Sequence, residues 1–157
     1  MNYHIKQAGT ASEYEAGAAM FLAYANSLDF TLCFQNFDDE LTILPQMYGE
    51  PTGALFLVEA DNQAIGVAGL RRIENDHTCE VKRMYIKPEF QGMGIGKALL
   101  GALIEKAEVL GYQTIKLDTL GPKMPAAVKL YKSFGFVETP PYNYNPYEGV
   151  LYFEKKI

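Results

Sequence analysis

The chain has 157 residues, of which 48% are hydrophobic and 21% are charged, and its formal net charge is −5. This length and composition are typical of one globular domain with a substantial core, and they exclude a disordered chain. The acidic balance argues against a nucleic-acid partner, so any phosphate site must be local, built from backbone amides and a few cations.

The sequence also argues against a membrane partner and a metal site. The first residues lack the apolar run of a signal peptide, and no stretch approaches the ~20 apolar residues of a membrane helix. Cys33 and Cys79 are not at metal-ligand spacing. Each lies in apolar surroundings, so we expect buried thiols and a reducing, cytoplasmic location, with a disulfide as the less favoured alternative.

The amino-terminal third predicts one strand and two helices. Residues 3–8 form a short strand. A capping box at residues 10–13 then starts a helix, and apolar residues at helical spacing extend it to about Leu28. Residues 38–40 are acidic, which favours the N-terminal end of a second, short helix that ends before Pro45.

A three-stranded meander is expected next, followed by a glycine-rich turn. The first two strands form a hairpin, since only a tight turn separates them. The strands of the meander are residues 54–60, 64–70 and 79–86. After Pro88, the glycines Gly92, Gly94 and Gly96 remove side chains, so backbone N–H groups can point outward together with those at the start of the next helix. This arrangement predicts a site for a phosphate-bearing ligand.

The last third predicts a strand, a helix and a final pair of strands. The helix that follows the glycine turn runs on to Gly111. A later helix has Pro125 in its first turn, where no donor is lost, and Gly135 ends it as a left-handed cap. The remaining predicted elements are a strand at 114–118, the helix at 125–134, and strands at 136–139 and 150–154.

Two nucleotide-binding templates fail at the glycine turn. The dinucleotide pattern G-x-G-x-x-G has Lys97 at its third glycine, and the P-loop pattern has Gln91 and Ala98 at two required positions. The run from Gln91 to Lys97 instead resembles the Q/R-x-x-G-x-G/A pyrophosphate turn of the GNAT acetyltransferases. A plain strand-to-helix turn that favours glycine is the alternative.

A second segment supports the same resemblance. Residues 127–136 are similar to the family pattern A-x-x-L-Y-x-x-x-G-F, and the order of predicted elements is similar to the GNAT fold from end to end. Many members have Asn where this chain has Met124, so the resemblance does not extend to that coenzyme contact. The resemblance implies one α/β domain over residues 1–157, with a mixed, mostly antiparallel twisted sheet flanked by helices.

The resemblance further implies that acetyl-CoA is the co-substrate, without a metal, and that a small-molecule amine is the acceptor. In that family the strand before the glycine turn splays from the strand after the helix, and the pantetheine arm enters the gap. The coenzyme-binding residues implied are Met84, Tyr85, Ile86, Gln91, Gly92, Met93, Gly94, Ile95, Gly96 and Lys97.

Two catalytic residues are expected. Tyr131 resembles the family's general acid, since a phenol of pKa ~10 stays protonated at neutral pH and can share its proton with a thiolate. Its alternative is a core tyrosine, and both can hold together. Glu80 is the candidate base, with Asp118 as a stand-in. The alternative for Glu80 is a surface strand acid that pairs with Lys82 or Arg72.

Strand alternation divides the strand at residues 79–86 between two faces. One face carries Glu80, Lys82 and Met84, and the other carries Val81, Arg83 and Tyr85. Val81 and Tyr85 look like core against a helix, so a cation between them is unusual. Arg83 is predicted to anchor an acidic group, on the substrate or on an internal partner such as Asp118. The alternative is an arginine that snorkels past the core.

The acceptor pocket is expected to include Phe34, Arg83, Asp118 and Tyr144, because aromatic residues on loops suit a partly wet site for a small molecule. The alternative is that these rings pack loops onto the core. The leading interpretation is an N-acetyltransferase that acts by direct transfer on an amine of a small molecule or an amino-acid-like acceptor. An acyl-CoA-binding sensor or partner module without catalysis is the second. The sequence leaves the oligomeric state open, and a homodimer is possible.

Overall fold

The computed structural model describes residues 2–28 and 36–157. The predictions for Cys33 and Phe34 lie outside the described residues. Within them, seven strands form a sheet of order β1-β2-β3-β4-β5-β7-β6. β4 and β5 are parallel, and the other neighbouring pairs are antiparallel. The strands are β1 (His4–Gln7), β2 (Ala54–Ala60), β3 (Gln63–Arg72), β4 (Thr78–Ile86), β5 (Thr114–Leu120), β6 (Val137–Glu138) and β7 (Val150–Lys156).

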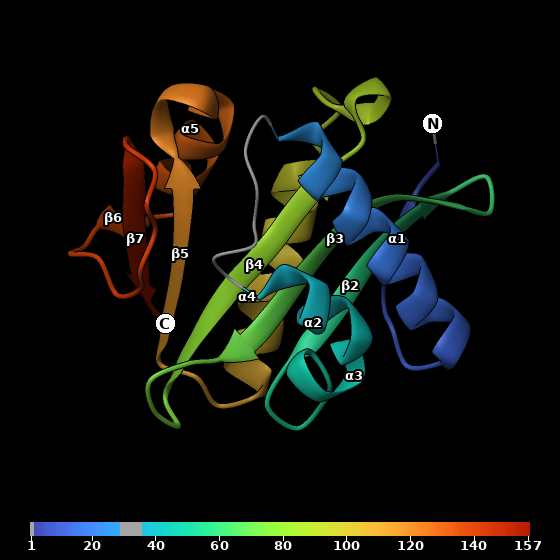
Figure 1. Cartoon of the computed structure of the whole chain (residues 1–157), viewed down its shortest axis with the longest axis horizontal. Coiled ribbons are helices and arrows are strands. Elements are labelled where there is room, and N and C mark those ends of the chain that lie inside the picture. The colour runs from blue at the N-terminus through green and yellow to red at the C-terminus, as the bar shows by residue number, and fades with distance from the viewer. Residues whose placement is uncertain (1, 29–35) are drawn as a thin grey trace.

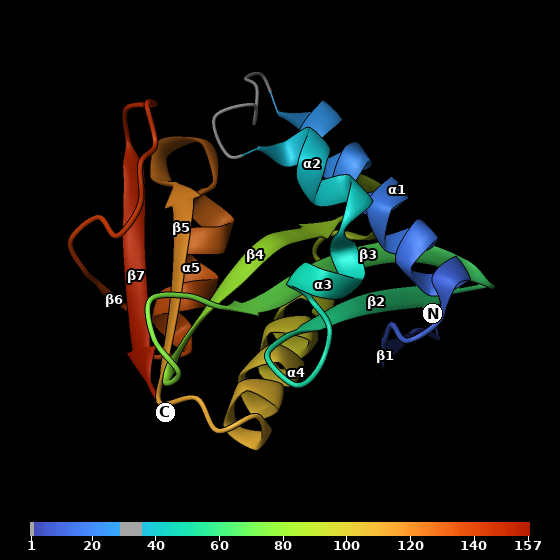
Figure 2. The ribbon, with the colours of Figure 1, turned by 60° about the horizontal axis from the view of Figure 1, so that its bottom comes forward.

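Helices cover both faces of the sheet (Figures 1 and 2). One face carries α1 (Ala11–Ser27), α2 (Phe37–Thr42) and α3 (Leu44–Met47), and the other carries α4 (Ile95–Val109) and α5 (Pro125–Ser133). Two short 3-10 helices, η2 (Pro88–Phe90) and η3 (Gly121–Lys123), precede α4 and α5. This is the mixed sheet with flanking helices that the sequence predicts.

The core has one part on each face of the sheet. Leu99, Leu100 and Leu103 of α4 are fully buried in the larger part. Phe21 of α1 and Tyr48, which follows α3, are fully buried in the smaller part and meet edge to face with ring centroids 5.6 Å apart. Burying one such side chain contributes about 1.5–3 kcal/mol to the stability of the fold. The three leucines therefore hold α4 firmly against the sheet.

β4 and β5 stay together for only a short distance. Their pairing covers residues 78–80 of β4 and 114–116 of β5, and the two strands separate beyond it, as Figure 1 shows. The Lys87 N–H donates to the backbone oxygen of Ile65, near the start of β3, at 2.9 Å. Since successive residues of a strand address opposite edges, the N–H and C=O of Ile86 face the gap. The far half of β4 therefore presents backbone groups to the space beside β5.

A β-bulge interrupts β4 at this point. The register with β3 shifts between Val67 and Gly69, and Arg83 has a left-handed φ of 58°. A bulge moves every later side chain to the opposite face. The predicted alternation is therefore wrong beyond Lys82: Val81 packs in the core under α4, whereas Tyr85 packs on the α1 side, with its ring centroid 5.8 Å from that of Tyr24.

Local predictions at the ends of elements are mostly confirmed. The capping box is present at the start of α1, and Gly135 ends α5 at φ 90°. The second helix ends at Thr42, before Pro45, as predicted, and the additional helix α3 follows it with Pro45 in its first turn. The predicted strand at 136–139 is shorter in the structure, since only Val137 and Glu138 pair with β7.

Candidate functional site

A cavity of about 600 Å³ lies where β4 and β5 separate. Its walls come from β4, β5, the glycine turn, the first turn of α4, and α5. The cavity lining includes Arg83, Asp118 and Tyr131 of the predicted catalytic and acceptor residues. Of the predicted coenzyme residues it includes Met84, Tyr85, Ile86, Gln91, Gly92, Gly94, Ile95, Gly96 and Lys97.

The glycine turn forms one end of this cavity. Gly92 and Gly94 both have φ of 80°, and a Cβ built on either would meet nothing within 4 Å, so the mouth of α4 is open. Gly94 is the N-cap of α4 and makes no side-chain capping hydrogen bond. The Gln91 side-chain amide donates to the Ile86 oxygen at 2.9 Å, which ties the turn to β4. The first-turn N–H groups of α4 are thus directed at a site that suits phosphate oxygens.

Tyr131 lines the cavity and packs in the core at the same time. Its ring meets Phe136 and Phe153 at centroid distances of 6.0 and 6.3 Å. Burial, with a smaller contribution from the charge of Asp118, raises the pKa of Tyr131 above its ordinary value. The phenol therefore keeps its proton at neutral pH, as a proton donor must.

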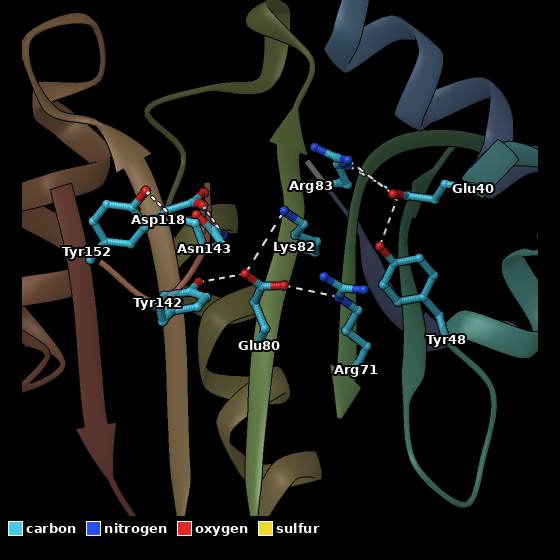
Figure 3. Close-up of polar contacts among 10 residues, drawn as sticks. All are labelled: Glu40, Tyr48, Arg71, Glu80, Lys82, Arg83, Asp118, Tyr142, Asn143 and Tyr152. Atoms are coloured by element: carbon cyan, nitrogen blue, oxygen red, sulfur yellow. Dashed lines mark hydrogen bonds and ion pairs between the residues drawn. The ribbon is translucent and has the colours of Figure 1, made fainter. Parts of the chain in front are cut away.

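Glu80 is fully buried and does not belong to the cavity lining. Its carboxylate accepts from Arg71 Nε at 3.0 Å and from the Tyr142 hydroxyl at 2.6 Å, and Lys82 Nζ lies 4.0 Å away (Figure 3). The alternative that Glu80 is a surface acid is wrong, because Glu80 is buried, although one of its expected partners, Lys82, does lie beside it. Its role as base stays a prediction.

Asp118 lines the cavity on the β5 side. Asn143 Nδ2 donates to Asp118 Oδ2 at 2.9 Å, and the Tyr152 hydroxyl donates to the backbone oxygen of Asn143 at 3.3 Å (Figure 3). Lys82 lines the same cavity from β4. Burial lowers the pKa of Lys82, while the charges of Glu80 and Asp118 oppose that shift.

Arg83 lines the cavity, but its carboxylate partner is Glu40 rather than Asp118. Arg83 Nε and a terminal guanidinium nitrogen donate to the two Glu40 oxygens at 3.1 and 3.0 Å, and the Tyr48 hydroxyl donates to Glu40 at 3.0 Å (Figure 3). The guanidinium also lies 5.1 Å from the ring centroid of Phe37. Sequence reasoning missed this role of Glu40, because its place in an acidic run indicated only a helix start.

Besides Glu80, two predicted site residues lie away from the cavity lining. Met93 is 53% exposed and Tyr144 is 72% exposed. Asn145, one residue further along the same loop, lines the cavity instead, as does Met124 at the departure from the family pattern. The aromatic loop thus contributes to the site through a neighbour of the residue that the sequence singled out. Binding roles for Met93 and Tyr144 stay predictions.

Within residues 2–28 and 36–157, no three His, Cys, Asp or Glu side chains gather in a way that could hold a metal ion. None of the helices described there combines the length and apolarity needed to cross a bilayer.

Comparisons with known proteins agree with this geometry. Residues 21–136 match the model of the acetyltransferase (GNAT) family. The chain is 39% identical over 130 residues to an uncharacterised N-acetyltransferase of Schizosaccharomyces pombe, covering 82% of this chain and 79% of that relative. It is 41% identical over 90 residues to an N-acetylaspartate synthetase of Danio rerio, which covers 57% of this chain but only 32% of that protein.

A solved structure shows the same fold. A GNAT-family acetyltransferase from Staphylococcus aureus superposes with a TM-score of 0.80 and covers 99% of each chain, at 20% identity. The family model spans most of the chain, and the relative from S. pombe is similar along most of its own length. The chain belongs to the GNAT family of acetyltransferases and is an acyltransferase enzyme.

Proposed function

We propose that this enzyme transfers an acetyl group from acetyl-CoA to the amine of a small, amino-acid-like molecule. The observation that carries the proposal is a single cavity that joins the glycine turn, the gap edge of β4, Tyr131 and Asp118. Together these provide a phosphate site, backbone donors, a phenol and a carboxylate. A thioester coenzyme and an amine require those four features.

The coenzyme would lie along the gap between β4 and β5. The N–H groups at the start of α4 would bind its pyrophosphate, with Lys97 at the same end of the cavity. The pantetheine arm would run beside the backbone of β4, where the Ile86 N–H and C=O face the gap. The thioester carbonyl would then accept a hydrogen bond from a β4 N–H. Removing one such donor typically costs about 10²–10³-fold in kcat.

The reaction is a direct transfer. The neutral amine attacks the thioester carbonyl, its nitrogen forms the new amide bond, and the bond from carbon to sulfur breaks. Tyr131 donates a hydrogen bond or its proton to the leaving sulfur. Asp118 lies in the cavity wall and is the carboxylate best placed to take the amine proton, while Glu80, the other candidate, would need to act through Lys82 or water.

Two observations support an amino-acid-like acceptor. Lys82 and Asp118 carry opposite charges on the two strands that line the cavity, so an ammonium and a carboxylate of one small molecule would find complementary groups. A relative that is similar over 57% of this chain is named for the synthesis of N-acetylaspartate, which is an acetylated amino acid. We also propose a cytoplasmic location, which the buried free thiol of Cys79 supports.

The test has two steps. Coenzyme A should raise the melting temperature of the protein, whereas NAD and ATP should not. Release of free thiol from acetyl-CoA is then measured with a panel that pairs each amino acid with its amide and its decarboxylated amine. Amino acids are expected to react fastest. Coenzyme binding without thiol release from any amine would favour a sensor module, and no stabilisation by coenzyme A would refute the proposal.

A further inference from the structure

The bulged residue of β4 belongs to a buried ion pair. Arg83 is the residue with the left-handed φ, and its guanidinium makes two hydrogen bonds to Glu40 of α2. Both side chains are buried, with 4% and 3% of their surface exposed. Tyr48 donates to the same carboxylate, and Phe37 lies beside the guanidinium. Three side chains thus surround the guanidinium of one residue with irregular backbone.

The position of this pair relative to the cavity is informative. Lys82, Arg83, Met84 and Tyr85 line the cavity, but Glu40 is absent from its described lining. Glu40 therefore acts on the site through Arg83, its neighbour in Figure 3. Buried ion pairs seldom stabilise a fold more than apolar packing of the same volume, and in some systems buried polar groups instead fix the register of the elements that carry them.

The bulge also fixes which backbone groups face the gap. Arg83 is inserted where the register with β3 shifts, so its conformation sets the register of Met84 and Ile86 relative to β3. An arginine relaxed to an ordinary φ would change the direction of the following N–H groups. Those groups are the donors that the proposed function assigns to the coenzyme.

We infer that Glu40 is a positioning residue: by holding Arg83 in the bulge, with Tyr48 as its support, it aims the β4 backbone donors at the coenzyme. The kinetic part of this inference rests on the proposed function, and the conformational part does not. Neither Glu40 nor Tyr48 belongs to the described cavity lining. Their removal should loosen β4 locally and slow the transfer step more than it weakens coenzyme binding.

The test compares Glu40→Gln and Tyr48→Phe with Leu103→Ala, a control that removes buried apolar volume from α4 on the opposite face. Amide hydrogen exchange is followed by mass spectrometry in peptides that cover residues 82–87, with peptides of β2 as an internal reference. We expect exchange at residues 82–87 to be at least about tenfold faster in Glu40→Gln than in the control. Tyr48→Phe should show a smaller increase in the same peptides.

Kinetics supplies the second readout. In Glu40→Gln, kcat should fall at least about tenfold while the KM for acetyl-CoA changes less than about threefold. Equal exchange in Glu40→Gln and Leu103→Ala would overturn the inference, and so would a wild-type kcat in a folded Glu40→Gln. If Glu40→Gln does not fold, Tyr48→Phe decides by the same exchange measurement. An inactive wild-type protein would count against the proposed function only, since the exchange result stands alone.

Discussion

Replacing Gly94 with glutamate tests the phosphate site most directly. Gly94 has φ of 80° and a Cβ there meets no atom within 4 Å, so the folding cost is the backbone cost of about 1–2 kcal/mol. A carboxylate about 4 Å from a phosphate costs between ~1 kcal/mol in water and ~4 kcal/mol at a dielectric constant of 20. Gly94 is exposed, so we take about 2 kcal/mol for the repulsion. Loss of one amide contact adds about 1 kcal/mol.

The sum of about 3 kcal/mol corresponds to a coenzyme A affinity weakened roughly 100-fold. Calorimetric titration measures it, and circular dichroism checks that the variant is folded. Gly94→Ala is the matched control, because it carries the same backbone cost without the charge and should bind within a few-fold of the wild type. The difference between the two variants should shrink as salt is added. Wild-type affinity in folded Gly94→Glu would refute the assignment of the turn.

Four further variants test the remaining site and the fold. Tyr131→Phe should keep coenzyme affinity and slow turnover by about 10²-fold or more, and an unchanged rate in the variant would remove its acid role. Because burial raises the pKa of Tyr131, the wild-type rate should not fall near pH 10 through loss of the Tyr131 proton. Asp118→Asn should lower kcat/KM by about 10²-fold, whereas the same loss in Glu80→Gln alone would make Glu80 the base. Hydrogen bonds from the Gly9 and Thr10 amides and from Lys6 lower the folded pKa of Glu13 from 4.5 to about 2, so its stabilisation is complete above pH 4.5 and lost as pH falls towards 2. Urea unfolding of Glu13→Gln across this range should show a deficit that disappears in acid.

Local chemistry explains what the sequence predicted well. The glycine turn, the proline in the first turn of α5 and the left-handed Gly135 each depend on residues within a few positions of one another. Their backbone preferences therefore act before any tertiary contact forms. The same holds for the capping box of α1, where Thr10 and Glu13 satisfy each other's backbone donors.

The bulge could not be predicted in this way. Alternation along β4 assumes an unbroken ladder, and the conformation of Arg83 depends on Glu40, 43 residues earlier in the chain. Likewise, Glu80 is buried because Arg71 and Tyr142 supply donors, and Tyr142 lies 62 residues later. The sequence pattern predicts that a polar residue in a strand is exposed, because it gives no sign of partners that lie far away in the chain. The missed features are thus the ones that long-range pairing decides.

The charged side chains of α2, β3, β4 and β5 beside the cavity constrain which acceptors fit. Apart from Lys97 and Lys123 of the lining, three cations and three carboxylates stand there, so this group is formally neutral although the protein as a whole is acidic. They are Arg71, Lys82, Arg83, Glu40, Glu80 and Asp118. A bound zwitterion keeps this balance, whereas a simple ammonium brings one uncompensated charge into a site where charges are poorly screened. Only after Asp118 takes its proton would a simple amine become neutral. The acceptor that costs least to bind is therefore one that carries its own carboxylate beside the amine.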